Sequence, residues 1–271
     1  MAELEPHRGT RSTKEAFTKA IVRAPCANFA AGLTSVELGA PDLEVALQQH
    51  EAYCRALEYC GLSLTRLDPD DRYPDSTFVE DTAVLMERGA VITRPGAASR
   101  VGETEEIERV LREHFPNVGA ITEPGTLDGG DICQAGNLFF IGISGRTNSR
   151  GARQLATFLS EAGYVPTLID IRNLSNILHL KSGLAYLGGN RMLVIDELKG
   201  LRQLSQYEAI NVDNAEAYAA NCLAVNDTIL VAAGFPILQQ RLHKLGYKTI
   251  ALNMSEFQKM DGGLSCLSLR F

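Results

Sequence analysis

Two side chains in the sequence could together carry out nucleophilic catalysis, Cys266 and His179. Cys266 follows a glycine pair in G-G-L-S-C-L-S, and a cysteine becomes a strong nucleophile when a neighbouring group favours its thiolate. His179 lies in I-L-H-L-K, whereas the other histidines fall in the N-terminal segment or on and at the ends of predicted helices. Each has a simpler interpretation alone, because cysteine between leucines and histidine among leucines usually belong to a core. Catalysis requires a fold that brings the two together.

Acidic residues in two segments could orient the histidine and bind a cation. Asp128, in T-L-D-G-G-D, could orient the imidazole, although an aspartate before glycines also commonly forms a turn. Asp75, Glu80 and Asp81 lie in P-D-S-T-F-V-E-D, where the last two would point to opposite faces of a strand. Such a cluster is usually a solvated edge. At the mouth of a closed ring, however, it would form a pocket for a small cation.

Other chemistries find no matching motif. The segment His50-Glu51-x-x-Cys54 resembles the start of a zinc-binding helix but lacks the second histidine. The sequence contains no G-x-x-x-x-G-K-[ST] phosphate loop, no G-x-G-x-x-G after a strand and no G-x-S-x-G turn. We therefore predict an enzyme that uses no metal and no other cofactor.

Composition narrows the class further. The net charge of −7 argues against a nucleic-acid surface, and no apolar run approaches the roughly 18 residues that a membrane span needs. Residues 1–17 are charged throughout and lack the apolar stretch of a secretory signal, so we expect a flexible extension followed by one domain, residues 18–271. Six cysteines without a C-x-x-C pair indicate reduced thiols and a cytoplasmic location.

One unit recurs along the chain: a hairpin, an amphipathic helix and a short strand. Apolar residues at three- and four-residue steps predict helices over 41–60, 103–115, 148–162, 197–207 and 236–245. Apolar strands follow at 62–68, 118–123, 164–170, 208–213 and 247–253. Turn residues predict four internal hairpins, at 88–89, 135–137, 188–190 and 226–227.

A fifth hairpin can form only if the C-terminal strand pairs with the N-terminal strand A-I-V-R-A-P. That pairing would close five ββαβ units into a ring, whereas the alternative is an open α/β sheet. In the ring, the loops between each unit's last strand and the next hairpin would meet at one end of the axis. These loops contain most of the residues named above, which favours the ring.

Eight segments in order resemble the dimethylarginine dimethylaminohydrolase family, from about Lys19 to Phe271. They are G-L-T-S (32–35), P-D-S-x-F-V-E-D (74–81), I-T-R-P-G-A-x-S-R (92–100), T-L-D-G-G-D (126–131), R-T-N (146–148), L-H-L-K (178–181), A-A-N-C (219–222) and D-G-G-L-S-C-L-S (261–268). The resemblance implies a five-bladed α/β propeller of the guanidino-modifying (pentein) superfamily. It also implies a substrate that is a small cationic amino acid and a protein that is a monomer or a homodimer.

By resemblance, Cys266 is the nucleophile, His179 the acid and base, and Asp128 the residue that orients the histidine. Family members carry Glu or Asp at this last position, and the shorter Asp here leaves its contact with His179 open. The resemblance assigns the remaining substrate contacts to ten residues: Leu33 on a lid, Asp75, Phe78, Glu80, Asp81, Arg100, Arg146, Met260, Asp261 and Ser265. The two arginines would hold the α-carboxylate, and the acidic group would hold the guanidinium.

The implied reaction is hydrolysis of asymmetric dimethylarginine or monomethylarginine to citrulline and an amine, through an S-alkylthiouronium intermediate. Two alternatives stay open. One is an arginine deiminase or another guanidine hydrolase with the same Cys/His pair, although known arginine deiminases contain an inserted helical region for which this chain has no room. The other is a non-catalytic five-bladed propeller that binds a partner, which would need no converging Cys, His and carboxylates.

Overall fold

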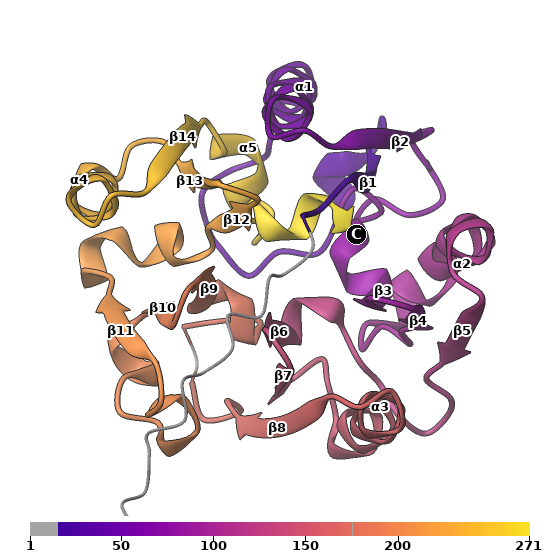
Figure 1. Cartoon of the computed structure of the whole chain (residues 1–271). Coiled ribbons are helices and arrows are strands. Elements are labelled where there is room, and N and C mark those ends of the chain that lie inside the picture. Colours follow the sequence, from indigo (N-terminus) through magenta and orange to yellow (C-terminus); the bar gives the residue numbers. More distant parts are fainter. Residues whose placement is uncertain (1–15, 175) are drawn as a thin grey trace, which may run out of the picture.

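The computed structural model describes residues 16–174 and 176–271, which form one ring of five three-stranded sheets around a central axis (Figure 1). The expected propeller and its five repeated units are thereby confirmed. Of the predicted N-terminal extension, residues 1–15 lie outside the described part of the chain.

Each sheet contains one hairpin and one further strand. The strands are β1 (Lys19–Arg23), β2 (Ser63–Leu67) and β15 (Leu269–Arg270); β3 (Ala83–Met86), β4 (Gly89–Ile92) and β5 (Asn117–Ala120); β6 (Ile132–Ala135), β7 (Leu138–Ile143) and β8 (Val165–Asp170); β9 (Leu184–Gly188), β10 (Arg191–Val194) and β11 (Glu208–Asn211); β12 (Leu223–Val225), β13 (Thr228–Ala232) and β14 (Lys248–Leu252). In every sheet the middle strand pairs antiparallel with one neighbour and parallel with the other. A parallel pair needs a crossover connection, and this explains the helix in most units.

The four longer helices lie at the periphery of the ring, and a single helical turn lies nearer its axis (Figure 1). They are α1 (Leu43–Tyr59), α2 (Thr104–His114), α3 (Ser149–Glu161), α4 (Pro236–Lys244) and the single turn α5 (Ser255–Gln258). The α1 and α3 termini are capped, because the side chains of Asp42 and Asn148 accept hydrogen bonds from free backbone N–H groups of the first turn. Pro236 opens α4, where its missing N–H has no cost.

The predicted helix over 197–207 is wrong. This segment forms two separate 3-10 turns, Asp196–Leu198 and Arg202–Leu204. Gly200 lies between them with φ of +82°, a left-handed conformation that a continuous right-handed helix excludes. The apolar pattern therefore marks buried residues such as Leu198 and Leu204, and not a helix.

The ring closes where the chain ends meet. β15 pairs antiparallel with β1, with Ala20 opposite Arg270 and Ile21 opposite Leu269. The backbone continues the contact, since the N–H groups of Thr18 and Lys19 both donate to the carbonyl of Phe271, at 2.9 and 2.8 Å. The predicted fifth hairpin, made from the two ends of the chain, is therefore present.

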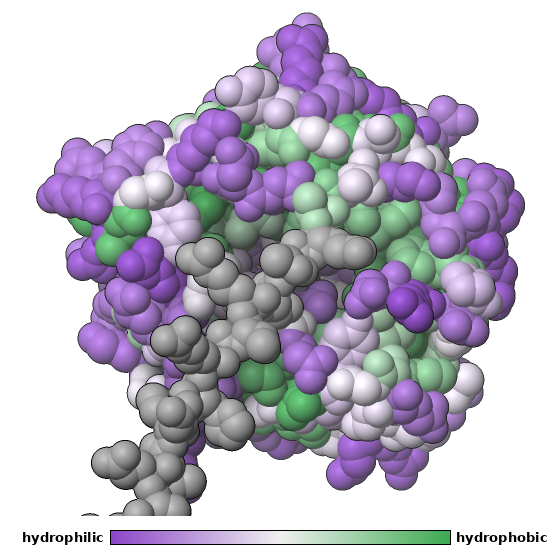
Figure 2. Space-filling view, in the orientation of Figure 1, coloured by the Kyte–Doolittle hydropathy of each residue, from purple (hydrophilic) through white to green (hydrophobic). Residues whose placement is uncertain are grey.

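The apolar core is distributed between the blades and the peripheral helices. One cluster joins the strands of the β9 sheet to those of its two neighbours, and another packs α1 against β1, β13 and the loop before Cys266. Figure 2 shows polar residues over the outer parts of the ring and apolar residues nearer its axis on the visible face. No helix among the described residues is long and apolar enough to cross a membrane.

Candidate active site

The loops before the first strands of the blades, together with the segments that follow β1, β4 and β7, enclose a small pocket of about 20 Å³. The residues that line it are Leu33, Asp75, Phe78, Asp81, Arg100, Arg146, Leu178, His179, Met260, Asp261, Gly262 and Cys266. Positions more than 200 residues apart in sequence therefore meet in one place, as the ring predicted. All the predicted site residues except Asp128, Glu80 and Ser265 line this pocket.

Cys266 lies in a 3-10 turn, Ser265–Leu267, at the end of the glycine-rich loop. Its sulfur accepts a hydrogen bond from the backbone N–H of Gly263 at 3.4 Å and lies 4.0 Å from the side-chain nitrogen of Asn221. Burial, together with the charges of Glu80 and Asp81, raises the pKa of the thiol to about 12. The free protein therefore holds a neutral thiol at neutral pH.

His179 contacts Asp128 directly. The imidazole Nε2 lies 3.0 Å from Asp128 Oδ2, and both side chains are buried. Asp128 is itself fixed, because its other oxygen accepts the N–H of Gly96 at 2.7 Å and its own N–H donates to the Thr147 hydroxyl at 3.1 Å. The shorter acidic side chain thus still reaches the histidine, which answers the question that the sequence left open.

The histidine carries a proton at neutral pH. Burial alone would lower its pKa, but the charge of Asp81, the hydrogen bond with Asp128 and the charge of Asp131 together raise the pKa of His179 to about 9. Gly130 passes so close that a Cβ there would lie 2.8 Å from His179 Nδ1 and 2.9 Å from Asp81 Oδ1. The second glycine of T-L-D-G-G-D is therefore required by packing against the two groups.

Asp131 is a buried carboxylate that the sequence interpretation missed. Its Oδ1 accepts the N–H of Leu180, next to the histidine, at 3.0 Å, and its Oδ2 accepts the Ser144 hydroxyl at 2.6 Å. The Ser144 oxygen in turn accepts the N–H groups of Arg146 and Thr147, each at 3.0 Å. One carboxylate thus joins the loop of the histidine to the loop of a pocket arginine. The signal was present as the last residue of the Asp-Gly-Gly-Asp segment.

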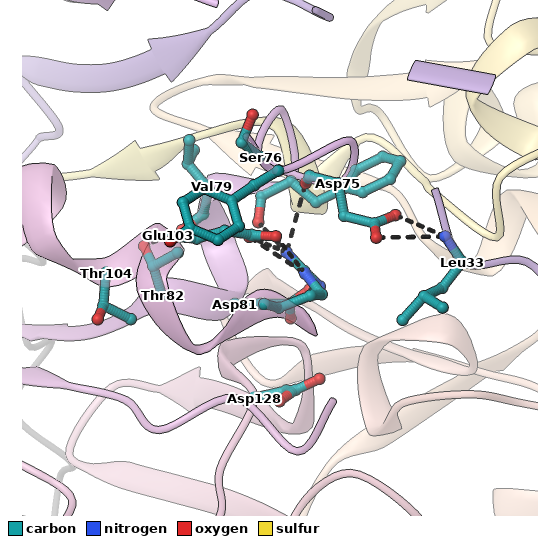
Figure 3. Close-up of polar contacts among 12 residues, drawn as sticks. Leu33, Asp75, Ser76, Val79, Asp81, Thr82, Glu103, Thr104 and Asp128 are labelled. Carbon is teal, nitrogen blue, oxygen red and sulfur yellow. Dashed lines mark hydrogen bonds and ion pairs between the residues drawn. The ribbon is translucent and has the colours of Figure 1, made fainter. Parts of the chain in front are cut away.

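Asp81 is held by an arginine on its far side. Arg100 Nη1 lies 2.7 Å from Asp81 Oδ2, and the same guanidinium binds Glu103 through Nη2 at 2.8 Å and Nε at 3.0 Å. Figure 3 shows this cluster of contacts around Asp81 and Glu103. Although the charges of His179 and Arg100 act against burial and lower the pKa of Asp81, Arg100 itself is occupied by protein carboxylates. Its predicted contact with the substrate α-carboxylate would compete with these partners.

Arg146 is the more available cation of the pocket. Its side chain is partly exposed and makes no hydrogen bond or ion pair with the residues that the structure describes. Its charge also acts on Asp75. Burial raises the pKa of this carboxyl group, and the charges of Arg100 and Arg146 lower it in part. A substrate carboxylate could bind here without displacing a protein partner.

The loop that begins at Gly32 covers the pocket. The N–H of Leu33 donates to both oxygens of Asp75, at 3.0 and 3.2 Å (Figure 3). Further along the loop, the N–H and hydroxyl of Ser35 donate to Asp261 at 2.5 and 2.9 Å. Leu33 is 41% exposed, so this part of the loop packs on the pocket only from outside. The small volume of the pocket fits the covered state of a lid.

Glu80 and Ser265 do not line this pocket, and their direct contact with the substrate stays a prediction. Glu80 lies in a 3-10 turn, Val79–Thr82, and not on a strand as expected. Its carboxylate binds Lys181 at 2.7 Å, Arg270 at 3.2 Å and the Ser265 hydroxyl at 2.7 Å. These contacts hold the Glu80 carboxylate outside the lining of the pocket, and its charge helps to raise the pKa of the Cys266 thiol.

Asp81, Asp128 and His179 offer three possible metal ligands within 4.8 Å of one another. Asp81 already forms an ion pair with Arg100, and the raised pKa of His179 keeps a proton on its imidazole. A divalent cation would have to displace the histidine proton and share Asp81 with a guanidinium. The charges at this position favour a proton over a metal ion.

The five-sheet ring and the pocket place the chain among the guanidino-modifying propellers, and the sequence profile described as arginine deiminase matches residues 66–212. N(G),N(G)-dimethylarginine dimethylaminohydrolase of Pseudomonas aeruginosa is 44% identical over 256 residues, which cover 94% of this chain and 100% of that protein. The protein of the same name from Streptomyces coelicolor is 36% identical over 253 residues, covering 93% and 96%. The chain belongs to the dimethylarginine dimethylaminohydrolase family.

Solved structures agree with this assignment. A cysteine-to-serine mutant of the P. aeruginosa protein in complex with citrulline matches with a TM-score of 0.92 at 44% identity, covering 94% of this chain and 100% of that one. The N-terminal domain of a cyanobacterial arginine dihydrolase matches with a TM-score of 0.85 at 19% identity, covering 94% and 97%. This second likeness shows the shared fold alone.

Proposed function

We propose that this chain hydrolyses asymmetric dimethyl-L-arginine, and monomethyl-L-arginine, to L-citrulline and dimethylamine or methylamine. The observation that carries the proposal is the meeting of Cys266, His179 and Asp81 in one buried pocket of a family member. A guanidinium is a poor electrophile because its positive charge is delocalised. A buried carboxylate can hold that cation in place while a sulfur attacks its central carbon.

In our proposal the substrate itself activates the nucleophile. In the free protein the carboxylates around Cys266 oppose a further negative charge, and this contributes to its high thiol pKa. A guanidinium that binds at Asp81 supplies a positive charge beside the sulfur and offsets that opposition. The thiol then loses its proton to solvent, because His179 is already protonated, and the thiolate forms a C–S bond with the guanidinium carbon.

His179 supplies and removes the remaining protons. Its protonated imidazole donates to the departing nitrogen as the C–N bond breaks, because an amide anion cannot leave. The neutral imidazole then takes a proton from water, which attacks the S-alkylthiouronium carbon. The C–O bond forms and the C–S bond breaks. The hydroxyl proton passes to the sulfur, so citrulline leaves and Cys266 is again a neutral thiol. Asp128 holds the ring through both halves of the reaction.

The other pocket residues would orient the amino-acid end of the substrate. We assign the α-carboxylate first to Arg146, which has no competing partner among the described residues, with Arg100 behind Asp81. Asp75, Asp261, Met260 and Leu33 lie at the lid, where the α-ammonium group would be bound, and Phe78 packs beside them. A cytoplasmic location, and a state that is either monomer or homodimer, stay predictions.

An assay of citrulline formation tests the proposal. We expect turnover of asymmetric dimethylarginine by the full chain, undiminished by a chelator, and none by Cys266→Ser, whose circular dichroism spectrum should match the parent. Turnover by Cys266→Ser close to that of the parent would refute the nucleophile, and loss of activity with the chelator would refute the metal-free mechanism.

The match to the arginine deiminase profile keeps one alternative in the comparison. Arginine, monomethylarginine and dimethylarginine should therefore be assayed side by side. A higher kcat/KM for unmethylated arginine would make the chain an arginine deiminase. No turnover of any of the three would favour the non-catalytic propeller.

A further inference from the structure

A second and larger cavity lies on the axis behind the catalytic pocket. Its volume of about 150 Å³ is well above the roughly 10–15 Å³ that one water molecule needs. Glu80 and Ser265, directly behind Asp81 and Cys266, border it at one end. Leu85, Gln134 and Ala224, further along the inner strands, border it towards the other. The two cavities thus share the partition that Glu80 and its partners form.

The formal charges of the described residues that line this cavity do not sum to zero. Among its described lining residues, only Glu80, Lys181 and Arg270 are charged, which makes two cations and one anion. Both cations approach the same carboxylate oxygen, Oε1, at 2.7 and 3.2 Å, while Oε2 accepts the Ser265 hydroxyl. One formal positive charge is therefore left over beside the cavity.

The surroundings make that excess charge costly unless an anion accompanies it. Apolar side chains form most of the wall, including Ile132, Phe139 and Leu184, and a low-dielectric wall strengthens each electrostatic interaction. The Lys181 ammonium carries three N–H bonds, and Glu80 is its one polar partner among the residues described. Its side chain is 16% exposed and that of Arg270 13% exposed. Arg270 Nη1 already donates to the carbonyls of Ser265 and Ser268 and to the Ser268 hydroxyl, so the donors left for an anion are those of Lys181 Nζ and of Arg270 Nη2 and Nε that Glu80 does not take.

From this geometry we propose that the second cavity binds a small monovalent anion of halide size, held by Lys181 and Arg270. The volume accepts such an ion with its remaining water molecules, whereas a bulky organic anion would not pass among the inner strands. The site is separate from the pocket that takes the substrate, since Cys266 and His179 line only the other cavity.

The anion should also affect turnover, and this part rests on the proposed function. Lys181 is a positive charge that favours the thiolate of Cys266, and Ser265, next to the nucleophile, is held by Glu80. An anion bound to Lys181 would offset that charge and compete with Glu80 for the two cations. The thiolate would form less readily, so kcat should fall severalfold while KM for dimethylarginine stays unchanged.

Bromide is a suitable probe because its anomalous scattering locates it without reference to activity. Crystals of the full chain grown in sodium bromide should show an anomalous peak between Lys181 Nζ and the Arg270 guanidinium. In solution, sodium bromide should lower kcat relative to sodium glutamate at the same ionic strength. No peak in the parent protein would overturn the site, and a peak without any change in kcat would overturn its coupling to Cys266.

Two variants and a control sharpen the test. Arg270→Gln removes the excess charge, and Ala224→Met fills the cavity while every charge stays in place; both should lose the bromide peak and the sensitivity of kcat to bromide. Arg270→Lys, which keeps the charge, should retain both. Should Arg270→Gln fail to fold, Ala224→Met alone decides. A chain that binds bromide but makes no citrulline would refute the proposed function and leave the anion site standing.

Discussion

At the scale of single residues, the chemistry depends on which groups carry charge before the substrate arrives. His179 enters the reaction protonated because buried carboxylates raise its pKa, and Cys266 enters neutral because burial, together with the charges of Glu80 and Asp81, raises the pKa of the thiol. The two catalytic groups therefore do not form a ready ion pair in the free protein. In the proposed mechanism an active nucleophile arises only when a cation occupies the pocket, which would restrict the reaction to cationic substrates.

Asp131→Asn tests whether this buried carboxylate positions the histidine and sets its pKa. Burial raises the pKa of Asp131 to about 6, so above that pH its charge helps to keep His179 protonated. Loss of that charge should lower the pKa of His179 and move the alkaline limb of kcat to lower pH. We also expect kcat to fall roughly tenfold, a part of the 10²–10⁴-fold typical of general acid–base catalysis.

Ser144→Ala is the matched control, because it removes the hydroxyl that donates to Asp131 but leaves the carboxylate charge. Its alkaline limb should stay where the parent has it, even if kcat falls. An Asp131→Asn profile with an unmoved limb would show that Asp131 supports the loop without acting on the histidine.

Arg146→Ala addresses recognition of the amino-acid end. A hydrogen bond to a charged group contributes about 1.5–3 kcal/mol, so KM for dimethylarginine should rise roughly 10–100-fold. An alkylguanidine without a carboxylate should bind the parent and the variant equally well in a competition assay. Arg150→Ala, at an exposed cation nearby, should change neither value. Equal losses for both ligands would contradict the assignment of the carboxylate to Arg146.

The sequence showed which residues could carry out the proposed chemistry, but it did not show how their side chains are oriented. Cys266 and His179 could be found because two corresponding loops of a repeated unit contain them. The sequence could not distinguish the position of Glu80 from that of Asp81, since both are acidic residues of one segment. Glu80 lies outside the pocket lining because it binds Lys181 and Arg270, which are distant in sequence. Asp131 was overlooked although it ends the Asp-Gly-Gly-Asp segment, because the sequence does not show that its carboxylate accepts the N–H of Leu180 beside the histidine.

At the scale of elements, the fourth unit shows where periodicity misleads. Its crossover has the apolar spacing of a helix but folds into two 3-10 turns around Gly200. A buried irregular segment and an amphipathic helix can share one pattern, so only the glycine distinguishes them. Elements with a capping residue and a closing glycine, such as α1, were predicted to within two residues at the N-terminal end.

Gly200→Ala tests that reading of the crossover. A Cβ in a left-handed conformation costs roughly 1–2 kcal/mol, so the free energy of unfolding in urea should fall by about that amount. Gly145→Ala is the control, because a Cβ there meets nothing within 4 Å and its backbone is not left-handed. It should change stability by less than about 0.5 kcal/mol. A stabilising effect of Gly200→Ala would mean that the segment prefers a helix.

At the scale of the whole molecule, catalysis depends on ring closure. The residues of the pocket come from loops of different blades, so their distances are set by how the sheets pack around the axis and not within any one sheet. The sequence shows five repeated units but only four internal hairpins, and this was enough to predict that the terminal strands pair and close the ring. The ion pairs of Glu80 with Lys181 and Arg270 were not predictable. They join residues of three separate segments, and the sequence does not show how far along the axis each segment lies.

Leu269→Ala tests how much the terminal strand contributes. Leu269 is buried and lies opposite Ile21 in the pairing that closes the ring. Loss of its side chain should lower the free energy of unfolding by about 2–5 kcal/mol, as large-to-small core changes do. Leu168→Ala, at a leucine that is 36% exposed on β8, should cost less than about 1 kcal/mol. Comparable small losses would show that the ring holds without β15.

Because β1 pairs with β15, a chain that began at another blade could form the same ring. Thr18 and Phe271 are already in hydrogen-bond contact, so a short linker could join them without stretching the sheet. New ends could then be opened at the hairpin tip around Gly136, where nothing packs within 4 Å of an added Cβ. Such a circular permutant would keep every blade and every pocket residue while it moved the point at which synthesis begins.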